Sequence, residues 1–390
     1  MEQVNSQVLY AVIILYSIIT GLYLSRYQIN CIKKEHPTKF GKRLMLVSLP
    51  LLLVLVLNDS CTDFYSYVRI FNMSSFESLY TTNEEIGWIA LNALLKLITT
   101  DGVIAINILR GLTFALFVLA IYKMQRFVDV GWSWIAFVCM GYFNILSMVA
   151  FMMAVAFVLL ACTNLIAKKY KLMLFELTLG VLMHYTAVIP VAMFILFFVC
   201  YGYPYTRKLF VAISVGGAII IALLSRYIFV AVASNIPFLN KYLGYGLYSS
   251  SGTGLRQIAY YFPIFVCLYF AAYNSKNRVM TFSFIIALVG FTVGICSYSI
   301  NNLKRTYLFF IFLYIAFLPA LILNQETYKW RRNVFANDKA GTGVIGIVPF
   351  TSGSFKFLVL VYLVYRAINL LSSEWATLYS SGFSEFHFLF

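Results

Sequence analysis

One apolar segment contains a glutamate and a histidine at a spacing that allows both to lie on one side of a helix. Glu176, Gly180 and His184 follow one another at intervals of four residues, so a helix beginning near Leu172 presents all three on one face. The imidazole of His184 can act as a general base or donate a hydrogen bond to a phosphate or a sugar. The alternative is an interhelical hydrogen bond that supports only the fold. We favour a functional role for His184 and a structural one for Glu176.

Carboxylates follow an earlier apolar run. Asp59 and Asp63 lie in the segment Asn58–Tyr67, where a carboxylate could activate a hydroxyl, bind a cation or cap a turn. A solvated loop carboxylate is the simpler interpretation, and it is the one that the sequence alone favours.

The stretch Glu85–Thr100 is predicted to be an amphipathic helix at the membrane surface, because a crossing here would reverse the charge bias of every later loop. The apolar face would contain Ile86, Ile89, Ala90, Ala93, Leu94 and Leu97. The polar face would contain Glu85, Asn92, Lys96 and Thr99. The residues Thr82–Glu85 have the pattern of a capping box that starts this helix.

Four cations are expected near the ends of apolar runs, on the side of the membrane that otherwise has few basic residues. They are Arg69, Arg256, Lys304 and Arg305. Such a group could hold an anionic lipid head, especially a diphosphate, because Arg offers planar bidentate donors. Pairing with nearby carboxylates is an alternative of equal weight. Tyrosines around Lys241 and Tyr245 could stack on sugar rings, although an interfacial aromatic belt is the simpler explanation.

The composition places all these residues in a membrane protein. Of 390 residues, 62% are hydrophobic and only 11% are charged, and the mean hydropathy is +0.85. So few charges cannot cover a soluble domain of this size. We therefore predict an all-α, polytopic protein, with one integral membrane domain over residues 1–390 and ten to twelve transmembrane helices. The predicted spans are Val8–Ser25, Leu44–Leu57, Val103–Tyr122, Trp132–Leu146, Met148–Ala167, Leu172–Met183, Thr186–Cys200, Leu209–Val230, Ile258–Tyr273, Met280–Ser297, Tyr307–Leu323 and Phe357–Leu371.

The distribution of charge predicts the orientation. Most of the 29 Lys and Arg residues fall in alternate loops, which the positive-inside rule assigns to the cytoplasm, so both termini are expected outside. Residues 58–102 and 231–257 are then outer loops, and 324–356 is a cytoplasmic loop. Because the basic residues are divided among short loops, the net charge of +15 does not indicate nucleic-acid binding. Three His and seven scattered Cys show no metal-ligand spacing, so neither a metal site nor a cofactor is expected.

Five segments follow the order of the motifs of a known family. Cys61–Tyr67 is similar to its G-x-D-x-x-x-Y segment, Asn83–Asn92 to its E-P-G-F segment, and Met183–Ala187 to its histidine motif at the membrane edge. Asn240–Tyr245 is similar to a K-Y-x-x-Y loop, and Lys304–Phe310 to an R-x-x-Y-F helix start. Through these motifs the chain resembles the EpsG-like branch of Wzy-type polysaccharide polymerases, bacterial membrane glycosyltransferases with a GT-C-like architecture.

The resemblance implies a reaction at the outer leaflet of the bacterial plasma (inner) membrane. A hydroxyl of one undecaprenyl-diphosphate-linked repeat unit attacks the anomeric carbon of another, and lipid diphosphate leaves. The implied catalytic residues are Asp63, His184 and Arg305. The implied substrate-binding residues are Tyr67, Arg69, Glu85, Lys241, Tyr245, Arg256 and Lys304. The expected partners are the lipid-linked oligosaccharide, the bilayer and a chain-length regulator.

The chain departs from the family pattern at Val149–Ala154, where relatives have an Arg-Gln pair. Arg256 or Arg305 could substitute for that arginine. Two other functions are considered: another GT-C-like glycosyltransferase or polysaccharide ligase, and a lipid-linked oligosaccharide flippase. A flippase would line a central cavity with charge, whereas the polar residues here collect toward one face of the membrane.

Overall fold

The computed structural model describes residues 4–33, 37–59, 63–81, 84–125, 128–202, 278–296, 301–321, 353–381 and 385–386, with scattered positions between 220 and 235. The fold is all-α, as predicted, and an antiparallel pair of two-residue strands, β1 (Val4–Asn5) and β2 (Glu385–Phe386), joins its two ends. Four described helical segments are long and apolar enough to cross a membrane: Val8–Cys31, Gly102–Met124, Val130–Ser147 and Val149–Ile166. Shorter apolar helices accompany them. The chain is a polytopic membrane protein.

The helix bounds agree with most of the predicted spans. The helices up to His184 are α1 (Ser6–Lys33), α2 (Pro37–Val56), α3 (Phe64–Met73), α4 (Ile86–Leu95), α5 (Gly102–Met124), α6 (Val130–Phe137), α7 (Phe143–Ser147), α8 (Val149–Ile166) and α9 (Tyr170–Met183). The later ones are α10 (Val188–Gly202), α15 (Arg278–Cys296), α16 (Leu318–Leu321) and α18 (Gly353–Ser381). The predicted spans 209–230 and 258–273, the loop 231–257 and most of 324–356 lie outside the described residues, apart from the scattered positions.

The chain divides into two compact units, which are described separately. The first contains residues 1–187, 314–334 and 349–390, and the second contains residues 188–313 and 335–348. In the first unit α8 packs against α5 and α9, and nearly all of its side chains are buried. The contact of α1 with α6 depends on glycine, because a Cβ added to Gly131 would lie 2.0 Å from the carbonyl oxygen of Gly21.

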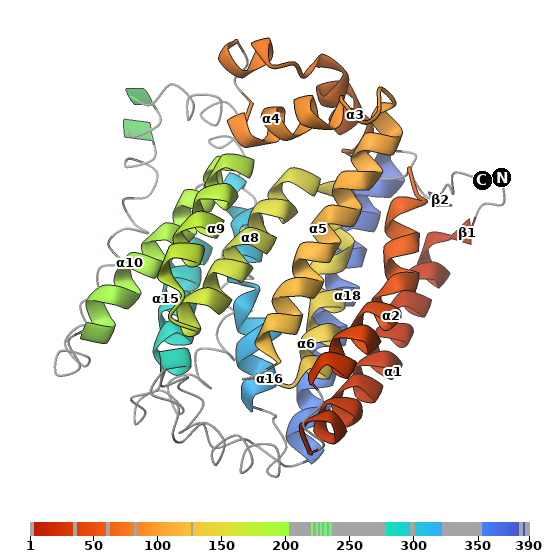
Figure 1. Ribbon diagram of the computed structural model, residues 1–390, viewed down its shortest axis with the longest axis vertical. Coiled ribbons are helices and arrows are strands. Elements are labelled where there is room, and N and C mark those ends of the chain that lie inside the picture. The colour runs from red at the N-terminus through yellow and green to blue at the C-terminus, as the bar shows by residue number, and fades with distance from the viewer. Residues whose placement is uncertain are drawn as a thin grey trace. The chain divides into compact units, whose positions relative to one another are not determined.

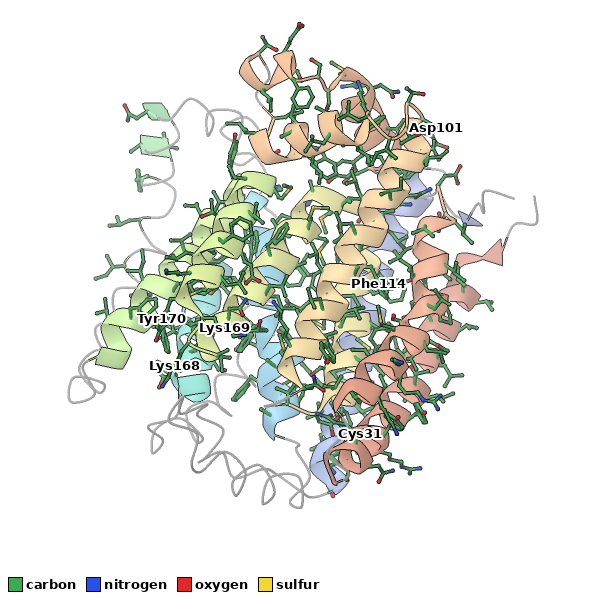
Figure 2. The ribbon with its side chains drawn as sticks, viewed as in Figure 1. Cys31, Asp101, Phe114, Lys168, Lys169 and Tyr170 are labelled. Carbon is green, nitrogen blue, oxygen red and sulfur yellow. The ribbon has the colours of Figure 1, made fainter. Side chains whose placement is uncertain are left out.

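The first unit has a basic end and, at its opposite end, the loop that contains α3 and α4. Figure 2 shows Lys168 and Lys169, in the turn between α8 and α9, at the same end as Cys31 of α1. Asp101 lies at the opposite end, where its carboxylate accepts hydrogen bonds from the first backbone N–H groups of α5. This division follows the predicted alternation of basic loops. Which end faces the cytoplasm stays a prediction.

A fully buried arginine, Arg110 of α5, ties the loop end of the first unit together. Its guanidinium donates to the carbonyl oxygens of Asn58, just beyond α2, and of Leu146, in the last turn of α7. It also lies over the ring of Phe64 in α3, 4.4 Å from the centroid. Carbonyls at a helix end have no partner within their own helix, so the arginine satisfies acceptors that would otherwise be buried alone.

In the second unit α10 packs against α15 through aromatic rings. The centroid of the Phe282 ring lies 5.5 Å from that of Phe194, 5.4 Å from that of Phe197 and 5.4 Å from that of Phe312. The span predicted to start at Tyr307 begins within a 3₁₀ helix, Asn301–Phe310. This unit therefore has its own apolar core.

Candidate active site

Helix α4 lies across the end of the first unit that is opposite the basic turns (Figure 1). It contacts α9 and α3. The contact with α9 is closest at Gly87, where an added Cβ would stand 2.7 Å from the carbonyl carbon and oxygen of Leu182. Glycine therefore allows the backbone of α4 to rest on the last turn of α9. This packing brings the start of α4 next to His184.

Helix α4 buries its predicted polar residues Glu85 and Asn92 together with Ile89 and Ala93 of the predicted apolar face, and exposes most of the rest of that apolar face. Glu85 and Asn92 are 6% and 0% exposed, whereas Leu94 and Leu97 are 51% and 77% exposed. In water this arrangement would be inverted, but it suits a helix whose outer face meets lipid. The amphipathic helix is thus present, with its polar residues used for packing inside the protein.

The predicted capping box is wrong. Helix α4 begins at Ile86 with Glu85 as its N-cap, and the Glu85 side chain makes no capping hydrogen bond. Thr82 stands too far before this start to cap it. The Glu85 carboxylate therefore does not cap α4, and it lies near the end of α9.

His184 is the first residue beyond α9 and has an extended backbone. Its Nδ1 accepts a hydrogen bond from the backbone N–H of Thr186 at 3.3 Å and lies 2.9 Å from the hydroxyl oxygen of the same residue. The ring of Phe151, near the start of α8, packs edge-on against the imidazole at 5.0 Å. A backbone N–H can only donate, so Nδ1 keeps its lone pair and the neutral ring carries its proton on Nε2. His184 is thus poised to donate rather than to accept at Nε2.

Glu85 supplies a carboxylate beside this imidazole. Its Oε1 lies 4.0 Å from Nδ1 of His184, which is longer than a hydrogen bond. The backbone N–H of Ile86 donates to the Tyr185 hydroxyl at 3.3 Å, so the start of α4 and the chain after α9 are joined at this point. The arrangement brings together a proton acceptor and an N–H donor, the two groups that general acid–base chemistry on a hydroxyl requires.

Four further residues lie around Glu85 and His184 and were not among the sequence-predicted site residues. They are Trp88, Phe151, Thr186 and Tyr185. Trp88 follows Glu85 by one helical turn, and its ring meets that of Tyr67 edge-on, with centroids 5.5 Å apart. The spacing from Glu85 could have identified Trp88 as a member of the helix face that contains Glu85 and Asn92. The contact of Phe151 with His184 joins distant parts of the chain, and no local pattern predicts it.

The other sequence-predicted residues of the loop 58–102 lie in or next to α3. Asp63 precedes α3 without a side-chain capping bond, and Arg69 is exposed. Asp59 accepts a hydrogen bond from the Tyr65 hydroxyl at 3.4 Å. Burial and the charge of Asp59 raise the pKa of Tyr65 above its ordinary value, so this phenol stays protonated and remains a donor.

The predicted cations of the later loops are placed only in part. Arg305 belongs to the second unit, in the 3₁₀ helix, and its side chain is exposed. The side chain of Lys304 lies outside the described residues, as do Lys241, Tyr245 and Arg256.

Glu176, Gly180 and His184 all lie against α8, as their spacing predicts. Asn164 of α8 donates to Glu176 at 2.5 Å, a Cβ added to Gly180 would lie 3.3 Å from the carbonyl oxygen of Ala154, and Phe151 packs against His184. Glu176 also pairs with Lys123 of α5 at 3.4 Å. Glu176 therefore joins three helices, which is the structural role that the sequence favoured for it.

The described residues contain no group of three or more His, Cys, Asp or Glu side chains suited to hold a metal ion. The free cysteines among them, Cys31, Cys139, Cys162 and Cys296, are buried.

Comparison with known proteins identifies the family. The EpsG family model matches residues 42–337, a range that includes α4, Glu85, His184 and the candidate cations. Neither a curated protein nor a solved structure gives a significant match to the chain. The family match covers well over half of the 390 residues. The protein therefore belongs to the EpsG family.

Proposed function

We propose that this protein polymerises undecaprenyl-diphosphate-linked oligosaccharide repeat units into surface polysaccharide at the outer leaflet of the bacterial plasma membrane. Membership of the EpsG family indicates a polysaccharide polymerase that acts as a membrane glycosyltransferase. The observation that carries the proposal is the pair of buried Glu85 and partly exposed His184 where α4 begins and α9 ends, at the end of the first unit opposite the basic turns. With the basic end in the cytoplasm, this pair lies at the level of the outer leaflet.

In the proposed reaction a hydroxyl of one repeat unit attacks the anomeric carbon of another. A new glycosidic C–O bond forms, the bond between the anomeric carbon and the diphosphate oxygen breaks, and its electron pair leaves with the lipid diphosphate. The proton of the attacking hydroxyl passes to a carboxylate. We assign this role to Glu85, because it is buried beside His184, and keep Asp63 at the start of α3 as the second candidate.

His184 is proposed to donate from Nε2 to a sugar or diphosphate oxygen, because its Nδ1 already accepts from Thr186. Arg69, Arg256, Lys304 and Arg305 are the candidates for stabilising the departing diphosphate. The leaving group is activated before it reaches the protein, so the reaction requires no nucleotide. Independence from metal ions and contact with a chain-length regulator are further parts of the proposal.

The test compares Glu85→Gln and His184→Ala with Glu77→Gln, which makes the same change of charge at an exposed position of the same loop. Each variant complements a strain that lacks the gene, and surface polysaccharide and lipid-linked intermediates are separated on gels. We expect the first two variants to lose long chains while single repeats are still exported. Glu77→Gln is expected to give wild-type chain lengths.

The outcomes separate the alternatives. Normal chain lengths in both Glu85→Gln and His184→Ala would refute this site. Single repeats that remain on the cytoplasmic face in the deletion strain would indicate a flippase. Long chains that are made but not transferred onward would indicate a ligase.

A further inference from the structure

We propose that Asn92 and Trp88, on the inward face of α4, form a sugar subsite that binds one pyranose ring of the lipid-linked glycan. The inference rests on the proposed function, because it names residues that bind the substrate of that site. It starts from polar atoms that the fold of the described residues leaves without a partner.

Three buried polar atoms of α4 have no hydrogen-bond partner in the part of the chain that the structure describes. They are both amide atoms of Asn92, Oδ1 and Nδ2, and the indole Nε1 of Trp88. Asn92 is 0% exposed and Trp88 is 1% exposed. Native proteins leave few such groups unsatisfied, and groups that are unsatisfied call for a specific explanation. Two neighbouring residues with three such atoms indicate a site that is completed by another molecule.

Polar side chains close to Trp88 and Asn92 in this loop have partners within the protein. Lys96 follows Asn92 by one helical turn, and its ammonium donates to the carbonyl oxygens of Asn72 and Ser74 at 2.8 and 2.6 Å. Ser78 exchanges hydrogen bonds with Ser75. Within α4 the unsatisfied atoms therefore lie on the stretch that continues the face of Glu85, and Asp59 Oδ1 is a further buried atom of the loop without a partner among the described residues.

The spacing places these atoms beside the proposed acid–base pair. Glu85, Trp88 and Asn92 follow one another at intervals of three and four residues and so form one stripe along the helix. Glu85 stands at the end of this stripe nearest His184, and Tyr67 packs edge-on against the Trp88 ring. A ring held by Asn92 and Trp88 would present its hydroxyls toward Glu85.

The chemistry of the stripe selects a neutral, hydroxyl-rich ligand. A carboxamide offers one acceptor and one donor side by side, which matches two vicinal hydroxyls of a pyranose. The indole adds a single N–H donor and an aromatic surface. A diphosphate fits poorly, because the Asn92 oxygen and the Glu85 carboxylate would both repel it. The stripe therefore suits a sugar ring rather than the charged head of the lipid.

Burial of both side chains requires α4 to move for the ring to enter. The contact of Gly87 with the Leu182 backbone marks the closed position. In that position the buried amide and indole have no accessible space beside them, so the ring binds when α4 is displaced, and ligand binding stabilises the displaced helix.

The experiment uses variants that remove the polar atoms and keep the volume: Asn92→Leu and Trp88→Phe. Lys96→Met is the matched control, because its polar group has partners within the protein. Each is purified in detergent, and both the unfolding temperature and the KM for chain extension are measured. The substrate is the lipid-linked single repeat extracted from the deletion strain.

We expect Asn92→Leu to raise KM about tenfold and Trp88→Phe to raise it roughly threefold to fivefold, with an unfolding temperature equal to that of the wild type or higher. Lys96→Met should lower the unfolding temperature and leave KM unchanged. An Asn92→Leu variant that loses as much thermal stability as Lys96→Met, with KM unchanged, would show that bound water completes a structural site and would overturn the proposal.

A binding measurement separates this subsite from the polymerase function. The oligosaccharide released from the lipid by mild acid should raise the unfolding temperature of the wild type but not that of Asn92→Leu. Inorganic diphosphate should change the unfolding temperature of the wild type and of Asn92→Leu by the same amount. If the wild type fails to extend chains but its unfolding temperature still rises with the oligosaccharide, the polymerase function is refuted and the subsite is supported. If chains are extended and Asn92→Leu binds oligosaccharide like the wild type, only the subsite falls.

Discussion

The backbone N–H of Thr186 donates to Nδ1 of His184 across 3.3 Å, so the neutral imidazole carries its proton on Nε2. A glutamine side chain can place an amide N–H near the position of Nε2 but provides no base. We predict that His184→Gln keeps roughly a tenth of the wild-type chain-extension rate, whereas His184→Ala loses about 100-fold or more. The measurement is extension of lipid-linked repeats in proteoliposomes.

The control for this prediction is Thr186→Ala, which removes the hydroxyl at 2.9 Å and keeps the backbone N–H. It should retain a rate near that of the wild type. Equal losses in the glutamine and alanine variants of His184 would show that the imidazole acts as a base.

Gly87→Ala should displace α4 from the end of α9. The new Cβ would stand 2.7 Å from the Leu182 carbonyl, a backbone group that cannot rotate away. The clash is expected to cost roughly 1–3 kcal/mol, more than the helix propensity that alanine gains. Limited proteolysis of the α3–α4 loop should become faster, and chain extension should fall together with it.

Gly353→Ala is the matched change for comparison, because a Cβ there meets nothing within 4 Å. It should leave both proteolysis and chain extension unchanged. Wild-type protection of the α3–α4 loop in Gly87→Ala would mean that α4 is not held by this contact.

The ion pair of Lys123 with Glu176 should show coupling in a double-mutant cycle. Lys123→Met leaves the buried carboxylate with the Asn164 amide alone, and we expect the free energy of unfolding to fall by roughly 1–3 kcal/mol. The double variant Lys123→Met/Glu176→Gln removes the uncompensated charge and should recover part of that loss. Unfolding in detergent micelles measures each corner of the cycle.

Lys168→Met serves as the control, since Lys168 is an exposed cation at the basic end of the first unit. Its effect should be within roughly 0.5 kcal/mol of zero. Losses that simply add in the double variant would show that the two side chains do not interact.

The exposed apolar residues after α4 should enter the lipid. Leu97 and Ile98 are 77% and 78% exposed. A bimane fluorophore on Leu97→Cys, in a background without the native cysteines, should be quenched by brominated lipids in bilayers. The same probe on Glu77→Cys, an exposed polar position of the loop, should be quenched much less. Equal quenching at both positions would place the α4 surface in water.

The sequence alone determined the membrane class of the chain, the position of most helices and the alternation of basic and acidic ends. These properties follow from the hydropathy and charge of consecutive residues, because each span must satisfy its backbone within its own helix. It also placed the amphipathic helix near residues 86–95 and His184 at the end of an apolar segment.

The tertiary structure decided which polar groups meet. Glu176 and His184 lie on one face against α8, yet Glu176 pairs with Lys123 of α5 whereas His184 lies next to Glu85. The side of α4 that faces the protein depends on Gly87 resting on Leu182, a contact between segments far apart in the chain. Local spacing fixes which residues share a face, but only packing of distant helices determines what each face contacts and which nitrogen of His184 keeps its proton.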